Sequence, residues 1–252
     1  MQIIGIQDDS IKNNEFRLKL TNLEETPIIG FVSWLGVSRA KNELPDDSDR
    51  EVGGSAPSKQ RANDRNREQL ALSLVQKGKL DEAEDAYKEL IRLDNKNYIA
   101  HANLGAIYLM QGRNEESKSA LRETLKLKEN HIETNYNLGC LLNKLNDFSE
   151  AVKFFDRALK LNPNHFNAHL YRGKALQEQS HLSDAIAAYT KALELKPNHV
   201  ETSICLGVAL QETKEIEAAI KIYKKIIRLK PDQLEAHINL GVALQDQGNL
   251  EA

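Results

Sequence analysis

The sequence has few cysteines and no motif typical of a metal or cofactor site. Its 252 residues include only two cysteines, Cys140 and Cys205, which lie too far apart to predict a disulfide framework or a metal-binding pair. We therefore expect a reducing compartment, the cytoplasm, with no metal ion and no cofactor.

Long apolar runs are also missing. The longest one, residues 27–37, is about half the length that a bilayer-spanning helix requires. An apolar patch at the start of the chain is interrupted by Asp8 and Asp9 and lacks the basic residues that precede a signal peptide. We predict neither export nor membrane contact.

The charge of the chain does not favour either sign. It carries 34 basic and 37 acidic residues, a net charge of −3, so it lacks the basic excess of a nucleic-acid-binding surface. The composition is typical of a globular protein that does not bind nucleic acid.

Motifs of catalysis are not found either. There is no glycine-rich phosphate loop after a strand, no nucleophile elbow, and no histidine next to a serine or cysteine that could form a relay. Nothing near Cys140 or Cys205 would lower the pKa of a thiol, which favours small core or groove residues over reactive ones. We predict that the chain is not an enzyme and has no catalytic residues.

The first quarter of the chain differs in composition from the rest. In residues 1–37, Phe16, Leu18 and Leu20 alternate with charged residues, a pattern typical of a short strand. Residues 38–63 contain no aromatics and many Gly, Pro, Ser and Asp, which predicts a flexible linker.

A repeat of 34 residues occupies residues 64–252. Small residues recur at this spacing, followed twelve residues later by another small residue and four residues after that by a large one. The first series, which Ala71 begins, continues with Gly105, Gly139, Gly173, Gly207 and Gly241; the second includes Ala83, Ser117, Ala151, Ala185 and Ala219. The large residues are Tyr87, Leu121, Phe155, Tyr189 and Tyr223, and prolines 163, 197 and 231 close three units.

These small residues indicate two helices that cross closely. Gly139 and Ala151 would face each other where the helices of one unit meet, because a larger side chain there would push the backbones apart. Glycine inside a helix costs about 1 kcal/mol relative to alanine, so its repetition at one register implies a packing reason. Phe155 would then fill the space toward the next unit.

The pattern resembles the tetratricopeptide repeat family, whose unit is a pair of antiparallel helices. The resemblance implies an all-α fold, an α-solenoid that forms a right-handed superhelix. The units would be 64–97, 98–131, 132–165, 166–199 and 200–233, with a partial sixth from 234 to 252. The second unit departs most, with Ser117, Thr124 and Glu129 at repeat-defining positions, and we expect it to be helical but less tightly packed.

Seven histidines raise the possibility of a metal site, which their register disfavours. His131, His165 and His199 occupy one point of successive units, and stacked helices lie about 10 Å apart, whereas the ligands of one zinc ion lie within about 4 Å of each other. Roles in turns and helix packing are the better interpretation.

Asparagines precede the Leu-Gly pair in three units, at Asn103, Asn137 and Asn239. In repeats of this family the first helices line the concave face, which implies that these amides point into a groove. An asparagine both donates and accepts hydrogen bonds, which suits a peptide backbone of any sequence. The arrangement is similar to the asparagine ladder in the repeat region of O-linked N-acetylglucosamine transferases, although Tyr171 and Cys205 interrupt it here. The other interpretation is that asparagine is tolerated on a solvated helix face.

The resemblance also places charged residues on the concave wall. In units four to six these are Lys174, Glu178, Glu201, Glu212, Glu235 and Asp246, a local net charge of −4. We expect an acidic distal groove, which favours an extended protein or peptide with Lys or Arg toward this end.

Three functions remain open at this point. The leading one is a non-catalytic adaptor or scaffold that binds an extended protein segment in the groove. The alternative is the substrate-recruiting part of a larger enzyme, such as a glycosyltransferase, whose catalytic domain is absent from this chain. A third is a structural spacer.

The last residues predict an incomplete unit. Residues 248–252 match the opening of a second helix, which would leave Leu240 and Leu244 without a partner inside their unit. We expect this edge to be covered by further chain or by self-association.

Overall fold

The described part of the chain consists of helices. The computed structural model describes residues 58–250, and side chains within 63–248. In residues 58–250 it contains eleven helices and no strand. These are α3 (Ser58–Gln76), α4 (Leu80–Leu93), α5 (Tyr98–Met110), α6 (Asn114–Leu127), α7 (Ile132–Lys144), α8 (Phe148–Leu161), α9 (Phe166–Glu178), α10 (Leu182–Leu195), α11 (Val200–Glu212), α12 (Ile216–Leu229) and α13 (Leu234–Leu250). The predicted all-α solenoid is confirmed, whereas the strand-like segment predicted in residues 1–37 lies outside the described residues.

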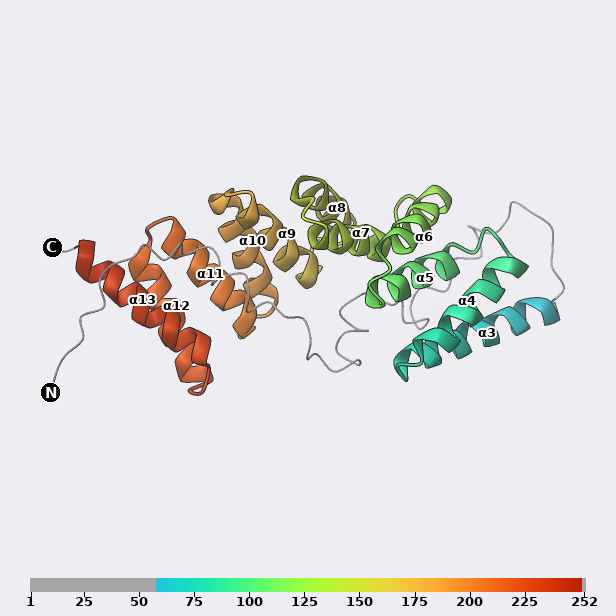
Figure 1. The fold of residues 1–252 in the computed structure, drawn as a ribbon, viewed down its shortest axis with the longest axis horizontal. Coiled ribbons are helices and arrows are strands. Elements are labelled where there is room, and N and C mark those ends of the chain that lie inside the picture. The colour runs from blue at the N-terminus through green and yellow to red at the C-terminus, as the bar shows by residue number, and fades with distance from the viewer. Residues whose placement is uncertain (1–57, 251–252) are drawn as a thin grey trace, which may run out of the picture.

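The helices alternate between two layers. Odd-numbered helices are the first helices of their units, and even-numbered ones are the second helices. Successive first helices pack against each other, but successive second helices approach less closely. The array therefore curves with its first helices on the inside, and Figure 1 shows α6, α8 and α10 along the outer edge of the arch.

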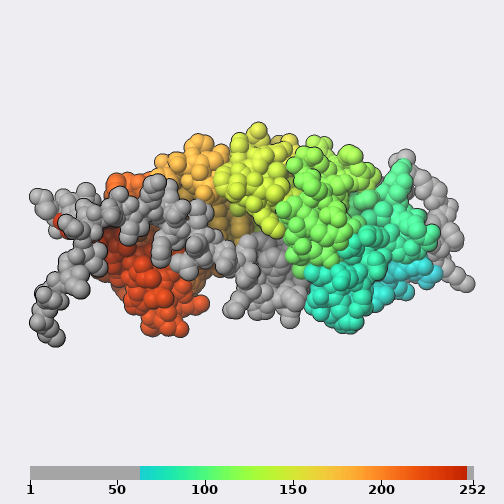
Figure 2. Space-filling view, in the orientation of Figure 1, coloured from blue at the N-terminus to red at the C-terminus, as the bar shows by residue number. Residues whose placement is uncertain are grey.

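Buried side chains form three neighbouring clusters along the array. Tyr87 belongs to the first, Phe155 to the second and Tyr223 to the third. Figure 2 shows the coloured units following one another without a gap along the upper edge of the molecule. Each unit thus contributes to the core of its neighbours, as expected for a repeat protein.

The repeated glycines lie directly under the large residues of the second helices. A Cβ atom built on Gly139 would lie 2.6 Å from the Phe155 ring, and one on Gly173 would lie 2.6 Å from the Tyr189 ring. The prediction of a close helix crossing is confirmed, but its geometry differs from the expected one. The atoms nearest to a Cβ on Gly139 belong to the Phe155 ring of the same unit and not to Ala151.

The second unit is packed as closely as the others. A Cβ atom on Gly105 would lie 2.7 Å from Leu121, and the Ser117 hydroxyl donates a buried hydrogen bond of 2.8 Å to the Gly105 carbonyl. The expectation of looser packing between α5 and α6 is therefore wrong, because serine at this position is small and its hydroxyl is satisfied by the backbone.

The turn between the two helices of a unit contains one residue in the left-handed region. The values of φ are 73° at Gly78, 74° at Gly112, 60° at Asn146, 60° at Ser180 and 67° at Lys214. These residues are spaced by 34, so the turn repeats even where glycine does not. A left-handed residue is a common way to end a helix.

The sixth unit does not make this turn. Gly248, at the equivalent position, stays inside α13, so the predicted start of a second helix after residue 248 is corrected within the described residues: 248–250 continue the first helix. The turns of the other units are each followed by a second helix that packs back onto the first, and no such packing is present for α13 in residues 58–250. Its side chains Leu234, Ile238, Val242 and Leu244 are 71%, 54%, 48% and 46% exposed. Self-association through this edge stays a prediction.

Helix α3 begins earlier than the sequence predicts. It starts at Ser58, directly after Pro57, so residues 58–63 belong to a helix and not to the linker predicted for 38–63. Low apolar content does not prevent a helix, and residues 58–76 contain neither Gly nor Pro. Residues 38–57 lie outside the described residues.

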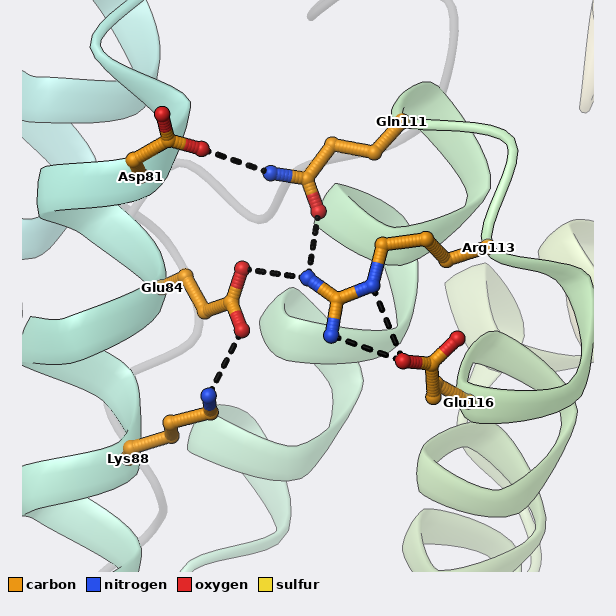
Figure 3. Close-up of polar contacts among 6 residues, drawn as sticks. All are labelled: Asp81, Glu84, Lys88, Gln111, Arg113 and Glu116. Carbon is orange, nitrogen blue, oxygen red and sulfur yellow. Dashed lines mark hydrogen bonds and ion pairs between the residues drawn. The ribbon is translucent and has the colours of Figure 1, made fainter.

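A polar network links the first two units. Arg113, in the turn between α5 and α6, donates to Glu84 of α4 at 2.6 Å and to Glu116 of α6 at 2.8 Å (Figure 3). Lys88 also contacts Glu84, at 2.7 Å, and Gln111 donates to Asp81 at 3.1 Å. Glu84 is 7% exposed. Burial alone would raise its pKa, but hydrogen bonds from Lys88 and Arg113 hold that pKa below its usual value.

The glycine contact predicts opposite effects for one substitution at two equivalent positions. Gly173→Ala should destabilise the fold by about 1–3 kcal/mol, because its Cβ would overlap the Tyr189 ring. Gly241→Ala should stabilise it by up to about 1 kcal/mol, because a Cβ there meets no atom within 4 Å and alanine is the better helix former. Urea denaturation of both variants measures the difference, and equal effects would contradict the close crossing.

The network around Glu84 predicts a stability that depends on pH. The ionised carboxylate stabilises the native state above its unfolded-state pKa of about 4.3, and this contribution is lost as pH falls through the lower native pKa. Glu84→Gln should therefore lower the thermal midpoint at pH 7, and the difference from the wild type should shrink in acid. Glu89→Gln, which removes an exposed pair with Arg92, serves as the control and should have little effect. A constant Glu84→Gln effect from pH 7 to pH 3 would show that the ion pairs do not stabilise the fold.

Candidate protein-binding groove

One side of each first helix points away from its second helix. The glycine at position 8 of a unit faces the second helix, and positions 2, 6, 9 and 13 lie about 100–160° around the axis from it. We call these positions the groove face. It comprises Ile99, Asn103, Ala106 and Met110 on α5; Glu133, Asn137, Cys140 and Lys144 on α7; Asn167, Tyr171, Lys174 and Glu178 on α9; Glu201, Cys205, Val208 and Glu212 on α11; and Glu235, Asn239, Val242 and Asp246 on α13.

The three asparagines of the groove face differ in burial. Asn103 is 6% exposed and Asn137 is 2% exposed, whereas Asn239 is half-buried. Tyr171 and Cys205 separate Asn137 from Asn239. The amides therefore do not form one continuous exposed row, and a contact with a ligand through Asn103 or Asn137 stays a prediction.

Lys174 is the centre of a charged cluster. Its ammonium group lies 2.6 Å from a Glu201 carboxylate oxygen and 5.1 Å from the centre of the Tyr171 ring. Burial opposes its charge, but Cys205, Glu201 and Glu235 outweigh this and raise the pKa of Lys174 above its ordinary value. The structure thus pairs this lysine with the next unit rather than with Glu178, which is exposed at the end of α9.

Glutamines hold two of the predicted acidic residues in place. The Tyr189 hydroxyl donates to Gln177 at 2.9 Å, and the Gln177 amide donates to the Glu212 carboxylate of the next unit at 3.1 Å. The same contacts recur one repeat later among Tyr223, Gln211 and Asp246, at 2.6 and 3.5 Å. Sequence reasoning missed these glutamines, although their 34-residue spacing was a usable signal.

Both thiols are in their protonated form at neutral pH. Burial raises the pKa of Cys140 to about 12 and that of Cys205 to about 11. A protonated, shielded thiol is a poor nucleophile and a poor metal ligand. This agrees with the interpretation of both cysteines as core or groove residues.

The repeated histidines act at helix starts. His131, His165 and His199 each accept a hydrogen bond through Nδ1 from the backbone amide three residues later. The Nε2 atoms of His169 and His237 both lie 2.8 Å from a proline carbonyl. Within the described residues, no group of three or more His, Cys, Asp or Glu side chains could hold a metal ion.

The helices form a helical-repeat solenoid. On its inner face, equivalent residues of successive first helices lie side by side. Tetratricopeptide repeat models match residues 102–135, 132–165 and 166–199, and a TPR repeat model matches residues 71–112 and 212–248. The array is therefore a tetratricopeptide repeat solenoid. No curated protein matches the chain.

Several solved structures share this fold. YrrB, a TPR protein with an unusual peptide-binding site, is 24% identical with a TM-score of 0.60, over 72% of this chain and 97% of that one. MamA from Desulfovibrio magneticus RS-1 is 20% identical with a TM-score of 0.63, over 68% and 97%. PilF of Pseudomonas aeruginosa is 17% identical with a TM-score of 0.66, over 76% and 88%.

The fold limits the general class of function. Tetratricopeptide repeats typically mediate interactions between proteins, and proteins built from them are generally non-catalytic interaction modules. Among the helices of residues 58–250, none combines the length and the apolar character that crossing a membrane requires.

The cluster around Lys174 predicts two pKa changes of opposite sign at Glu235. Burial and repulsion from Glu201 raise the pKa of Glu235, while Lys174 partly offsets them. Lys174→Met should therefore raise this pKa further, and Glu201→Gln should lower it. A titration followed by ¹³C NMR of labelled glutamate measures both, with Glu84 as the unchanged reference. Shifts of the same sign would contradict the arrangement.

Proposed function

We propose that the groove face binds an extended segment of another protein, with Lys or Arg side chains of that segment toward α11 and α13. In this proposal Asn103 and Asn137, on the groove face of α5 and α7, contact the backbone of the segment. The chain then acts as an adaptor or scaffold.

The distribution of charge along the groove face is the observation that carries this proposal. The face has no charged residue on α5, and one residue of each sign on α7 and on α9. By contrast, Glu201, Glu212, Glu235 and Asp246 give the groove-face positions of α11 and α13 a charge of −2 each, with no basic residue at those positions of either helix, although Lys174 of α9 pairs with Glu201. A concave wall with charge of one sign attracts ligands of the opposite sign.

The hydrogen bonds of the acidic wall support the same orientation. Gln177 and Gln211 each donate one hydrogen bond to the carboxylate at position 13 of the next unit, Glu212 and Asp246. A neutral amide orients a carboxylate without neutralising its charge. A glutamine of the preceding unit therefore orients each of these two carboxylates.

The spacing of the units fits an extended chain. Successive first helices pack directly, which places their axes about 8–10 Å apart. Three residues of an extended segment span about 10 Å. A segment that crosses the first helices would therefore meet an equivalent groove residue about every third position.

A binding experiment tests this function. Glu212→Gln combined with Asp246→Asn should weaken binding of a fluorescent, arginine-containing peptide by about two- to thirtyfold, because exposed ion pairs contribute about 0.2–1 kcal/mol each. Asp184→Asn with Glu217→Gln removes the same charge from exposed positions of the outer helices α10 and α12 and should leave binding unchanged. Wild-type binding should weaken as salt rises. Equal binding of a peptide with glutamate in place of arginine would contradict the proposal.

A further inference from the structure

Four of the first helices begin with the same side-chain hydrogen bond. Before α5 the Oδ1 atom of Asn97 accepts from the backbone amide of Ala100 at 2.9 Å. At the equivalent positions before α7, α9 and α11, the Nδ1 atoms of His131, His165 and His199 accept from the amide three residues later. Each acceptor satisfies an amide that the helix itself leaves unpaired. Asparagine and histidine therefore form the same helix cap in successive units.

A histidine cap, unlike an asparagine cap, depends on the protonation of the ring. Nδ1 accepts a hydrogen bond only while it carries no proton, so the proton of the neutral ring must lie on Nε2. Protonation converts Nδ1 into a donor that faces the amide N–H it had accepted. It also places a positive charge at the helix N-terminus, which carries a partial positive charge of its own. The amide of an asparagine does not change in this way.

The geometry at His199 makes the loss of its cap costly. Its Nδ1 atom lies 3.3 Å from the Thr202 amide nitrogen and 2.9 Å from the Thr202 hydroxyl, and Thr202 is fully buried. When the ring is protonated, the hydroxyl can turn and accept from it, but the buried amide loses its acceptor. The centre of the Phe166 ring on α9 lies 4.8 Å from that of the imidazole, so an apolar group borders the cap.

The charges around His199 are mostly positive. Burial disfavours the charged ring most, and three lysines add to this: Lys196 in the same turn, Lys174 on α9 and Lys230 at the end of α12. A fourth lysine, Lys225 of α12, donates to the Pro197 carbonyl of that turn at 3.3 Å. Glu201 of α11 favours the charged ring, but the net result is a pKa of His199 below its ordinary value of about 6.5.

The equivalent cap before α9 has a different neighbour. The Nε2 atom of His165 lies 3.6 Å from the Glu133 carboxylate, so an acidic group is directly beside that ring. The ring of His199 instead borders Phe166. Of these two caps, His199 is therefore the one at which a positive charge is least compensated.

The first turn of α11 also carries part of the acidic wall. Glu201 is a groove-face residue two positions after His199, and its carboxylate lies 2.6 Å from the Lys174 ammonium group. Loss of the cap loosens the turn that positions Glu201. The imidazolium also adds a positive charge near this carboxylate. Both changes reduce the attraction of the wall for a basic ligand.

We propose that His199 is a pH-dependent cap of α11, which holds the acidic wall in place when neutral and releases it when protonated. The effect on binding rests on the proposed function, whereas the effect on the helix does not. Because the folded-state pKa is lowered, the stabilising contribution is present above the unfolded-state pKa of about 6.5 and is lost as pH falls through the lower folded-state value.

Nitrogen-15 NMR tests the cap itself. In the wild type at pH 7.5 the His199 proton should lie on Nε2, and the Thr202 amide shift should titrate with a midpoint below 6.5. His199→Asn introduces the cap that Asn97 forms in the first unit and should abolish this titration. The ratio of Thr202 amide exchange rates, wild type over variant, should rise about two- to thirtyfold from pH 7.5 to pH 5, the expected effect of one helix cap.

The arginine-containing peptide tests the consequence for the groove. Arginine keeps its charge throughout this range. From pH 7.5 to pH 5, affinity for the wild type should fall by a factor about two to five larger than affinity for His199→Asn, the effect of one exposed charge pair. Glu235, whose pKa is raised by burial, changes charge in both proteins, so the comparison isolates His199. His199→Ser, which also caps helices, repeats the comparison if His199→Asn fails to fold.

The outcomes separate this inference from the proposed function. A His199 proton on Nδ1 at pH 7.5, or a Thr202 amide that titrates equally in His199→Asn, would overturn the inference and leave the proposed function in place. An equal loss of affinity in both proteins would overturn the link between the cap and the groove. A wild type that binds no arginine-containing peptide in low salt would overturn the proposed function, while a Thr202 titration confined to the wild type would still support the cap.

Discussion

The contact between a glycine of the first helix and a large side chain of the second determines the geometry of each unit. A ring can lie against the backbone of the first helix only where no Cβ is present, as at Gly139 and Gly173. This contact fixes how closely the helices approach, and it also fixes which side of the first helix is covered. The uncovered side becomes the inner surface of the curve. The position of the groove face therefore depends on the same contact that holds the unit together.

The regular repeat extends this local arrangement into a continuous inner surface. Since each unit repeats after 34 residues, equivalent side chains line up across successive first helices, as the Gln177 and Gln211 hydrogen bonds show. The outer layer does not share this property, because successive second helices approach less closely. An interaction that spans several units is accordingly favoured on the inner face. This is a physical reason to place the binding surface there.

Much of the fold could be predicted from the sequence, because the same spacing of small and large residues recurs in each unit and indicates how its two helices pack. The helix pairs, their register and the close crossing at glycine all followed from the spacing of small and large residues. The departures arose where propensity and packing disagree: α3 begins at Ser58 inside a polar segment, and Gly248 stays helical although its equivalents turn. Composition and register alone do not reveal either outcome.

The site was less predictable, because side-chain pairing across units does not follow from register alone. The sequence predicted that Lys174 lies on the concave wall, but only the structure shows that it pairs with Glu201 of the next unit. The burial of Asn137 could not be foreseen from a pattern that treats all three asparagines as equivalent.

Irregular units are therefore informative in a repeat protein. In the fourth unit Tyr189 supplies the hydroxyl that Gln177 accepts, whereas in the third unit Phe155 has none and the Asn143 carbonyl is left unpaired. The backbone of the two units repeats, but the side-chain hydrogen bond exists only where the large residue carries a hydroxyl. Side-chain pairing in a repeat array therefore depends on the particular residue at each position and not on the register alone.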